Sequence, residues 1–369
     1  MGAAACWYLS QRGQRVLGLE QFGIPHDKGS HAGQTRIIRN AYFEHPDYVP
    51  LLKRAYKNWF AFEEKTNAHY YHDTGILYFG LPDNENIRGI RHSARLHDII
   101  IEDWDRARYR SRYPGFQVPE GFDAIFEPDA GFVTPEDVVR TYVEDAVRHG
   151  ADIKSHTPVL TWKREGGKIR VRTPEGDYTS EKLVITAGPW ASEMIPTLKP
   201  ELTVTRQFLV WVDPPDPEPF SLGNFPCWFV EDPAMGTFYG FPVLPANEFK
   251  GPIGLKLAHH HPGEPCRPGD VAGRIPADDE HNIRRFLKTY LPLVGDKFLE
   301  VKSCLYTYSS DTHFIIDLLP GFGDDVAIAC GFSGHGFKFV PVVGEILADL
   351  AVDGETDLPA EFLGLERFS

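Results

Sequence analysis

Apolar residues along the chain follow two spacings that predict different elements. Small or helically spaced apolar residues predict helices over 3–9, 47–65, 135–149 and 340–350, and the pattern is clearest over 47–65. Shorter runs with β-branched and aromatic residues predict strands, which we place at 16–19, 78–80, 169–172, 182–186, 203–212, 237–241, 253–257 and 326–330. Helices and strands alternate near both ends of the chain, whereas strands dominate its middle.

This order predicts an α/β protein with two domains. A nucleotide-binding domain assembled from distant segments would enclose an inserted domain built on an antiparallel sheet. A chain of 369 residues is long enough for a large core in each domain. We expect the nucleotide-binding domain to comprise 1–80, 145–200 and 310–369, and the inserted domain to comprise 81–144 and 201–309.

The opening stretch, MGAAACWYLSQRGQRVLGLEQFG, is typical of the second half of a dinucleotide-binding unit. Its helix ends at Gly13 and its strand leads into Glu20, but the strand and the G-x-G that usually precede them are missing. An acid at the position of Glu20 accepts hydrogen bonds from an adenosine ribose and favours FAD or NAD over NADP. Glutamate also ends many strands that bind nothing, and the two interpretations carry equal weight.

Composition argues against several classes of protein. The formal net charge is −14 without a dense Lys/Arg block, so binding to nucleic acid or to an anionic membrane is not expected. No apolar run approaches the ~20 residues that span a bilayer, and the start has no secretory signal. Five scattered cysteines without a C-x-x-C pair indicate a reduced, cytoplasmic compartment and neither a disulfide framework nor a zinc site.

A glycine cluster, CGFSGHGFKF at 330–339, lies between a predicted strand and a predicted helix. Gly331, Gly334 and Gly336 would let the backbone approach a flat or anionic ligand, with amide groups of the helix start as donors. Lys338 adds a cation at the end of the cluster. From spacing alone, an ordinary glycine-rich turn explains the cluster slightly better than a binding site does.

Two arginines, Arg36 and Arg39, flank a pair of isoleucines in GSHAGQTRIIRNAY. On a helix they would share a face, and on a strand they would point to opposite faces. Beside apolar residues, such arginines can grip a carboxylate or a phosphate through paired hydrogen bonds. Solvated surface arginines are the commoner explanation for this segment by itself.

Three further features lie on strand-like runs. Lys256 in GLKLAHHH faces either solvent or a cavity, and solvent is the commoner outcome. The histidine triplet 259–261 suggests a metal, but adjacent histidines on a strand cannot converge on one ion, so no metal site is predicted. Cys304 lies where a cysteine usually fills the core, and its neighbours alone do not indicate a nucleophile.

Several stretches together carry a resemblance to a known family. They run in family order over nearly the whole chain: LEQFGIPHDKGSHAGQTRIIRNAY, YVPLLKRAYKNW, TGILYFG, LVITAGPW, NFPCWFVED, FYGFP, GLKLAHH, SCLYTYSSDTHFIIDLLP and GFSGHGFKF. With these segments the chain resembles the monomeric sarcosine oxidase and N-methyltryptophan oxidase family, which also includes pipecolate oxidase. The combination is far more specific than any single motif.

The resemblance implies FAD, held by a glutathione-reductase-like Rossmann domain, with an antiparallel substrate domain over the flavin. Gly2 matches the third glycine of the family's G-x-G-x-x-G, and Glu20 matches its ribose-binding acid. Cys304 matches the cysteine that bonds covalently to the flavin 8-methyl group, and Arg36 matches the arginine beside the flavin. Further cofactor contacts are expected from the glycine cluster: Gly331, Gly334 and Gly336.

The resemblance also implies oxidation of an N-methyl or cyclic amino acid to an imine, with reduction of O2 to H2O2. Arg39 and Lys338 match the pair that binds the substrate carboxylate. Lys256 matches the lysine that contacts flavin N5 through water and promotes oxygen reduction. The other matches line the substrate pocket: His260, Tyr306, Tyr239 and Phe229. The expected partners are the amino acid and O2, and the protein is expected to be a monomer.

Three residues depart from the family pattern. Ala32 stands where the family usually has a second histidine, which bears on the efficiency of flavin attachment. Phe229 replaces the methionine of sarcosine oxidase, so a reshaped pocket and a substrate other than sarcosine are open. Gln34 replaces an aspartate common in the bacterial enzymes and resembles the pipecolate branch; we expect it to lie outside the pocket.

The start of the chain differs from the family as well. Roughly a dozen family residues are absent, covering the first strand and the two glycines that approach the pyrophosphate. We expect their loss to expose apolar edges and to weaken FAD binding. Two alternatives to the oxidase therefore stay open: an FAD-dependent dehydrogenase that uses another electron acceptor, and a truncated flavoprotein without activity.

Overall fold

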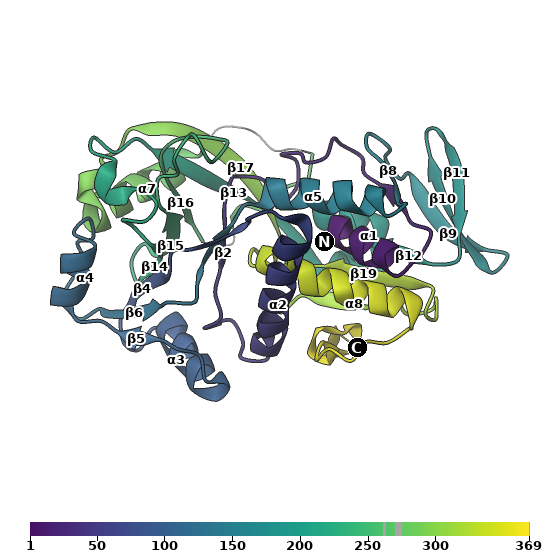
Figure 1. Ribbon diagram of the computed structural model, residues 1–369, viewed down its shortest axis with the longest axis horizontal. Coiled ribbons are helices and arrows are strands. Elements are labelled where there is room, and N and C mark those ends of the chain that lie inside the picture. The colour runs from purple at the N-terminus through teal and green to yellow at the C-terminus, as the bar shows by residue number, and fades with distance from the viewer. Residues whose placement is uncertain (261–262, 270–274, 369) are drawn as a thin grey trace.

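A computed structural model describes residues 1–260, 263–269 and 275–368. The molecule has two parts along its longest axis, and they lie at the left and the right of Figure 1. One part is built on short parallel strands between helices, and the other is built on a large, mostly antiparallel sheet. This is the mixed α/β architecture that the order of elements predicts.

Short parallel strands covered by helices form the first part. β1 (Leu17–Leu19) pairs in parallel with β8 (Asp152–Lys154), and β12 (Leu183–Ile185) pairs in parallel with β19 (Val326–Cys330). β18 (Ile315–Leu318) lies antiparallel on the other edge of β19, and the two groups of strands form separate sheets. The main helices beside these strands are α1 (Gly2–Gln11), α5 (Pro135–Arg148) and α8 (Val340–Val352).

Helix α1 packs closely on its neighbours because its residues are small. A Cβ atom added to Gly2 would lie 2.6 Å from Oγ1 of Thr186, directly after β12. A Cβ atom added to Gly344 of α8 would lie 2.6 Å from Cβ of Ala4. Real side-chain carbons do not approach so closely, so the two glycines set the distance between α1 and the elements around it.

A separate antiparallel sheet extends from this part, at the right of Figure 1. Its order is β11-β10-β9, and alternate residues of the central strand are buried. Arg170 and Arg172 on its exposed face pair with Asp177. The strands are β9 (Thr161–Glu165), β10 (Lys168–Thr173) and β11 (Gly176–Ser180).

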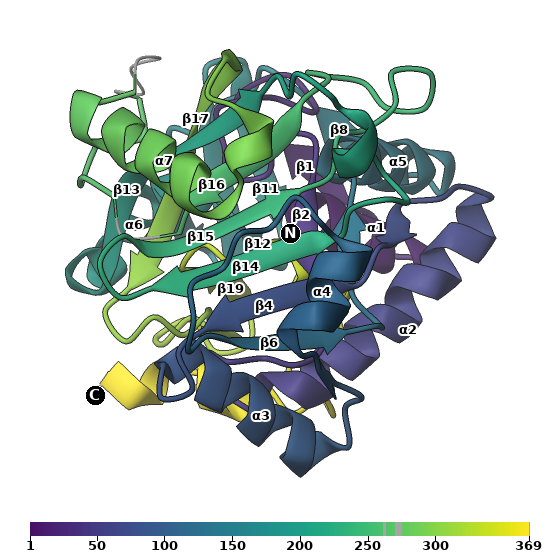
Figure 2. The same cartoon turned by 90° about the vertical axis from the view of Figure 1, so that its left-hand side faces the viewer.

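An eight-stranded sheet forms the second part, and all its neighbouring strands are antiparallel except the parallel pair β14 and β4. In spatial order the strands are β17 (Phe298–Ser309), β13 (Leu202–Val212), β16 (Leu255–His259), β15 (Gly236–Phe241), β14 (Cys227–Asp232), β4 (Ile76–Gly80), β6 (Asp123–Glu127) and β5 (Glu102–Asp103). Figure 2 shows its outer face, with α4 (Arg106–Arg112) and α7 (Ala277–Tyr290) in front.

The two faces of this sheet carry different clusters of side chains. Trp228 and Phe238 point outward and pack with Phe286 of α7. The next residue on each strand, Phe229 and Tyr239, belongs to the cluster on the inner face. Successive side chains of a strand point to opposite faces, so two neighbouring residues on one strand join different clusters.

A small antiparallel sheet lies between the two parts. Its order is β2-β7-β3, so β2 (Arg36–Ile38) has β7 (Gly131–Val133) on one edge only within the described chain. β3 (Tyr71–Asp73) lies on the far edge of β7. The long helix α2 (Tyr48–Thr66) follows β2 and packs against α8.

The elements predicted from hydrophobic periodicity are confirmed with small shifts of their ends. Helix 47–65 is α2, and strand 253–257 is β16 moved toward the C-terminus. α4, α7 and α3 (Glu85–His97) are not among the predicted helices, although α7 buries apolar residues at the helical spacing i, i+3, i+4 and i+7: Ile283, Phe286, Leu287 and Tyr290. Within the described chain, no helix is both long and apolar enough to cross a membrane. The short remaining helix is α6 (Ala191–Met194).

The division into two domains stays a proposal, and pairing alters its expected boundaries at two places. β4 pairs with β14 of the large sheet, although the expected boundary at residue 80 assigns it to the nucleotide-binding domain. α5 packs against α1, with Trp7 Nε1 donating to Asp145 Oδ2 at 2.6 Å, although 81–144 is expected in the inserted domain. Long-range pairing decides to which part of the molecule an element belongs, and the local sequence does not encode that pairing.

The close approach of α1 and α8 gives a stability prediction. Gly344→Ala should lower the free energy of unfolding by about 1–2 kcal/mol, because overpacking against Ala4 outweighs the gain in helix propensity. Urea unfolding followed by circular dichroism measures the difference. Gly269→Ala is the control, since an added Cβ there meets no atom within 4 Å. Equal losses in the two variants would contradict the packing argument.

Candidate active site

The inner face of the large sheet gathers most of the predicted site residues from separate strands. Phe229 lies on β14, Tyr239 on β15, Lys256 on β16, and Cys304 and Tyr306 on β17. Lys256 lies opposite Trp211 in the register of β13 and β16, and the other four belong to the inner-face cluster. Strand alternation therefore brings together residues that are up to 77 positions apart, 306 minus 229.

Arg36 reaches this face from β2. Its Nη2 lies 3.6 Å from Cys304 Sγ, and the guanidinium also donates to the carbonyls of Ser30 at 2.9 Å and Thr35 at 2.8 Å. Burial by itself would lower the pKa of Arg36, but the ionisable groups of Cys304 and Tyr239 raise it above its ordinary value. The arginine and the cysteine thus form one buried pair, and the arginine stays charged.

Lys256 is buried, not solvated, with 1% of its surface exposed. Its Nζ donates to the carbonyl of Gly33 and to the carbonyl and hydroxyl of Thr35, at 2.8 Å and 3.0 Å for Thr35. It also lies 4.5 Å from the centroid of the Phe241 ring. Burial, followed by repulsion from Arg36, lowers the pKa of Lys256 well below its ordinary value.

Aromatic rings surround the imidazole of His260. The centroid of the His260 ring lies 6.2 Å from Phe229, 6.0 Å from Tyr239 and 5.9 Å from Tyr306. The hydroxyls of the two tyrosines are 3.3 Å apart. Phe43, which follows β2, packs on Phe229 with a centroid distance of 5.0 Å. The predicted pocket residues therefore form one apolar box with hydroxyl and imidazole groups in its wall.

Arg39 points away from Arg36, as opposite faces of a strand require, and lies beside Lys338. It is 4% exposed and donates through Nη2 to both carboxylate oxygens of Glu44 at 2.7 Å. Its guanidinium lies 4.0 Å from the Phe43 ring and 4.5 Å from the Tyr42 ring. The Nζ of Lys338 lies 5.2 Å from the Tyr42 ring on the same side of the molecule and donates to the carbonyl of His335 at 2.7 Å.

These charges perturb one another strongly. Burial would raise the pKa of Glu44, but Arg39 lowers it to about 2. Burial and repulsion from Arg39 lower the pKa of Lys338 to about 7. Burial also lowers the pKa of His335 to about 3, and its Nδ1 is hydrogen-bonded to the Tyr42 hydroxyl. The cluster is a buried cationic site with one carboxylate already bound to its arginine.

The glycine cluster has a steric role. Gly331 and Gly334 have φ of 61° and 80°, the left-handed region that favours glycine. A Cβ atom on Gly334 would lie 2.4 Å from the Tyr306 ring, and one on Gly336 would lie 2.6 Å from Phe332. The turn therefore packs directly on the aromatic box and sets the position of Lys338, in the 3-10 helix 337–339.

Two residues suited to binding a dinucleotide, Glu20 and His31, lie in the segment that follows β1. Glu20 follows β1, and its Oε1 accepts from the amide of Phe22 at 2.8 Å. Burial would raise its pKa, but hydrogen bonding with His26 lowers it, so the acid stays ionised. His31 Nε2 is buried and has no partner in the described chain, and Glu20 and Arg36 both act on its charge. An orphan imidazole between the expected ribose acid and the Arg36–Cys304 pair fits a bound FAD.

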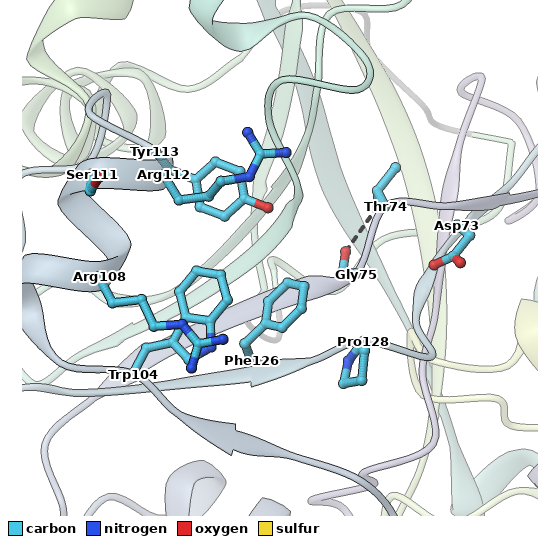
Figure 3. A pocket seen from close by; sticks show the side chains of 10 residues that line it. All are labelled: Asp73, Thr74, Gly75, Trp104, Arg108, Ser111, Arg112, Tyr113, Phe126 and Pro128. Carbon is cyan, nitrogen blue, oxygen red and sulfur yellow. Dashed lines mark hydrogen bonds between the residues drawn. The ribbon is translucent and has the colours of Figure 1, made fainter.

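Two open pockets of about 660 Å³ and 470 Å³ adjoin α4, and no predicted site residue lines either. Figure 3 shows the larger of the two, where Arg108 lies over the Trp104 ring. Arg108 also pairs with Glu102. In the described chain no group of three His, Cys, Asp or Glu side chains is placed to hold a metal, and His261 of the histidine triplet lies outside the described residues.

Comparison with known proteins decides the family. A family model described as FAD dependent oxidoreductase matches residues 1–350. The chain belongs to the FAD-dependent oxidoreductase family. Among similar members of this family, monomeric sarcosine oxidase of Arthrobacter sp. (strain TE1826) is 36% identical, covering 100% of this chain and 94% of its own. N-methyl-L-tryptophan oxidase of Yersinia pestis (strain Pestoides F) is 35% identical, covering 100% of this chain and 96% of its own.

Solved structures show the same fold. NikD, an unusual amino acid oxidase essential for nikkomycin biosynthesis, superposes with a TM-score of 0.85 at 23% identity, covering 98% of this chain and 94% of its own. L-proline dehydrogenase from P. horikoshii has a TM-score of 0.83 at 21% identity, covering 99% and 94%. The expected FAD-dependent oxidoreductase fold is confirmed.

Some residues of the site are not visible to sequence reasoning. His335 and His31 lie inside quoted segments and Glu44 lies two residues after one, but no spacing marks them as partners of Arg39, Lys338 or a cofactor. An acid five positions after Arg39 is the available signal for Glu44, and it is weak because acids are common there.

Gln34 lies beside the site. Its Oε1 accepts from Trp211 Nε1 at 2.9 Å, and Trp211 of β13 lies opposite Lys256 of the neighbouring strand β16.

The Arg39–Glu44 pair gives a stability prediction with a defined pH dependence. Glu44→Gln should lower the free energy of unfolding at pH 7 by about 3 kcal/mol, because it leaves a buried cation uncompensated. The folded pKa of about 2 is below the unfolded value of 4.5, so the carboxylate stabilises fully above pH 4.5 and less as the pH falls toward 2. Urea unfolding at pH 7 and pH 4 should show a smaller penalty at pH 4.

Glu345→Gln is the matched control for that experiment. Glu345 pairs with Arg54, whose side chain is 43% exposed, and also accepts from Asn58 Nδ2 at 2.8 Å, so its loss should cost about 1 kcal/mol, well below the cost for the buried pair. A penalty for Glu44→Gln that matches the control, or that grows as the pH falls, would contradict the buried-pair interpretation.

Proposed function

We propose that the protein oxidises a secondary amino acid, N-methylated or cyclic, to an imine and reduces O2 to H2O2. The observation that carries this proposal is the placement of two buried cations, Arg39 and Lys338, beside the aromatic box and near the Arg36–Cys304 pair. Relatives named sarcosine oxidase and N-methyl-L-tryptophan oxidase, 35–37% identical over almost the whole chain, support it.

The residues present fit an FAD cofactor. Glu20 would accept from the ribose, the start of α1 at Gly2 would face the pyrophosphate, and His31 would donate or accept at the cofactor's buried side. When bound, FAD supplies a two-electron acceptor for the C–H bond next to the amine and a donor of those electrons to O2. The glycine cluster would add cofactor contacts through Gly331, Gly334 and Gly336.

The substrate carboxylate would bind to Arg39 and Lys338. Both cations are already desolvated, so binding a carboxylate would not require removal of water from them. Glu44 holds the arginine in the structure, so the substrate competes with it or shares the guanidinium. The amine would then lie in the box of Phe229, Tyr239 and Tyr306, where His260 is the nearest group able to take up a proton.

A covalent flavin link through Cys304 is part of the proposal. The thiol is buried, 3% exposed, and its sulfur lies 3.6 Å from Nη2 of Arg36. Ala32, at the family's second histidine, contributes its carbonyl to Arg36 Nη2 at 2.5 Å. That contact needs no imidazole, so the arginine keeps its position despite the departure.

Lys256 bears on the choice between oxidase and dehydrogenase. Its cation would stabilise negative charge that develops on oxygen during reduction. All three acceptors of its Nζ, however, are on Gly33 and Thr35, which favours a structural role for Lys256 and a dehydrogenase as the second candidate.

We further propose that the protein is a monomer in the cytoplasm. The name of the monomeric sarcosine oxidase relatives and the scattered cysteines support this proposal.

Substrate oxidation is tested on purified holoenzyme with a panel of N-methyl and cyclic amino acids under air. Stoichiometric H2O2 supports the oxidase, whereas dye reduction without H2O2 would support the dehydrogenase.

Arg39→Met should raise KM by about tenfold or more, because a charge-assisted hydrogen bond to the carboxylate is lost. The double variant Arg39→Met/Glu44→Gln removes both charges of the pair, and Arg54→Met is the control. An unchanged KM would contradict the carboxylate role.

Flavin attachment is tested by acid precipitation. Cys304→Ser should release the flavin into the supernatant, whereas the wild type should keep it in the pellet, because an alcohol is a far weaker nucleophile than a thiol. Absorbance of both fractions at the flavin maximum measures the split. Cys227→Ser, on the same face of the sheet without a contact to Arg36, should behave as wild type. Flavin that stays attached to the Cys304→Ser variant would refute the assignment.

A further inference from the structure

The segment 33–41 carries both site arginines on very little regular structure. Only residues 36–38 form a strand, and within the described chain β2 is bonded to β7 alone. Arg36 points to Cys304 and Arg39 points to the cationic site. An edge strand of three residues cannot by itself hold two long side chains in fixed positions.

One end of the segment is held by Glu127, the last residue of β6. Its Oε1 accepts from the amides of Asn40 at 2.5 Å and Ala41 at 3.1 Å, directly after Arg39. Its Oε2 accepts from the Tyr78 hydroxyl at 2.8 Å, which fixes the carboxylate on the large sheet. The residue is fully buried, so these donors are what offset its desolvation.

The other end is held by Glu136, in the first turn of α5. Its Oε1 accepts from the amides of Gly33 at 2.6 Å and Gln34 at 3.1 Å, two residues before Arg36. Between the two acids, Lys256 donates to the carbonyls of Gly33 and Thr35. Each end of the segment is therefore gripped by a carboxylate that binds two consecutive amides.

We propose that Glu127 and Glu136 are positioning residues that clamp segment 33–41, so that Glu127 sets the place of Arg39 and Glu136 sets the place of Arg36. The roles of the two arginines rest on the proposed function, but the clamp itself does not. Glu127 belongs to the large sheet and Glu136 to α5, so the clamp also fixes the segment between the two parts of the molecule (Figure 1).

Two substitutions at Glu127 distinguish the effect of side-chain length from the effect of side-chain charge. Glu127→Asp keeps the charge but withdraws the oxygens from the amides by about one methylene, whereas Glu127→Gln keeps an acceptor oxygen in place without the charge. If position is what matters, Glu127→Asp should raise KM by about tenfold with kcat changed less, and Glu127→Gln should stay within about threefold of wild type. If charge on Arg39 is what matters, the order is reversed and the clamp is refuted.

Glu63 provides a matched control. It accepts from the amides of Tyr70 at 2.5 Å and Tyr71 at 2.7 Å, the same pattern at β3 of the same small sheet but away from both arginines. Glu63→Asp should speed amide exchange at 70–71 and leave KM within about twofold of wild type. A KM change as large as that of Glu127→Asp would show general loosening of the sheet and overturn the proposal.

Glu136→Asp tests the other end with a different readout. It should leave more flavin in the supernatant after acid precipitation, by about threefold or more, while KM changes less than in Glu127→Asp. Glu136→Gln should retain the flavin as wild type does. Loss of substrate affinity without any effect on flavin retention would place Glu136 in a role other than the one proposed.

Amide hydrogen exchange on the holoenzyme separates failure of the clamp from failure of the proposed function. Exchange in peptides covering 39–42 should be about tenfold faster in Glu127→Asp than in wild type, whatever the substrate is. If Glu127→Asp gives no folded protein, Tyr78→Phe, which frees the carboxylate on one side, should move exchange and KM in the same direction. Unchanged exchange in both variants overturns the clamp, whereas absence of turnover in wild type overturns only the proposed function.

Discussion

Burying positive charge in an apolar interior is the constraint on which the rest of this structure depends. Arg39, Lys256 and Lys338 are each at most 5% exposed, and desolvating a cation costs several kcal/mol unless acceptors surround it. Glu44 supplies them for Arg39, and backbone carbonyls supply them for both lysines. Each cation therefore requires a particular loop conformation close by.

The large sheet meets this constraint through its alternation. Its inner face receives the box residues and Lys256, and its outer face receives the apolar residues that pack under α7. Shifting the register of any one strand by a residue would send its site residue to the outer face. The small sheet and segment 33–41 lie against the inner face, where they bring backbone carbonyls to Lys256 and a guanidinium to Cys304.

The same arrangement bears on the proposed binding of a substrate carboxylate. Burial, followed by repulsion from Arg39, lowers the pKa of Lys338 to about 7, and Glu44 relieves part of that repulsion. A second carboxylate would relieve the remainder, and binding energy from a remote group could then orient the reacting amine. Electrostatic strain in the cluster and affinity for a carboxylate have one physical origin.

The sequence by itself determined the classes of element and the identity of the chemical groups. Helical spacing over 47–65 and alternation over 203–212 predict α2 and β13, because local periodicity reports which face of an element is buried. The quoted motifs indicate which arginines, lysines and cysteine belong to the family's chemistry. Spacing alone favours a solvated Lys256 and solvated arginines, because a local pattern does not reveal what packs on the other side.

Only the tertiary structure decided the partners of those groups. His335, Glu127 and Glu136 are ordinary polar residues in their own segments, and their hydrogen-bond partners lie far away in the chain. Glu44 lies only five residues after Arg39, but the burial of that pair depends on distant packing. Membership of β4 in the large sheet is likewise set by pairing with β14, about 150 residues away (227 minus 76). Hydrogen-bond satisfaction in a buried site is a property of the assembled whole, so no window of sequence contains it.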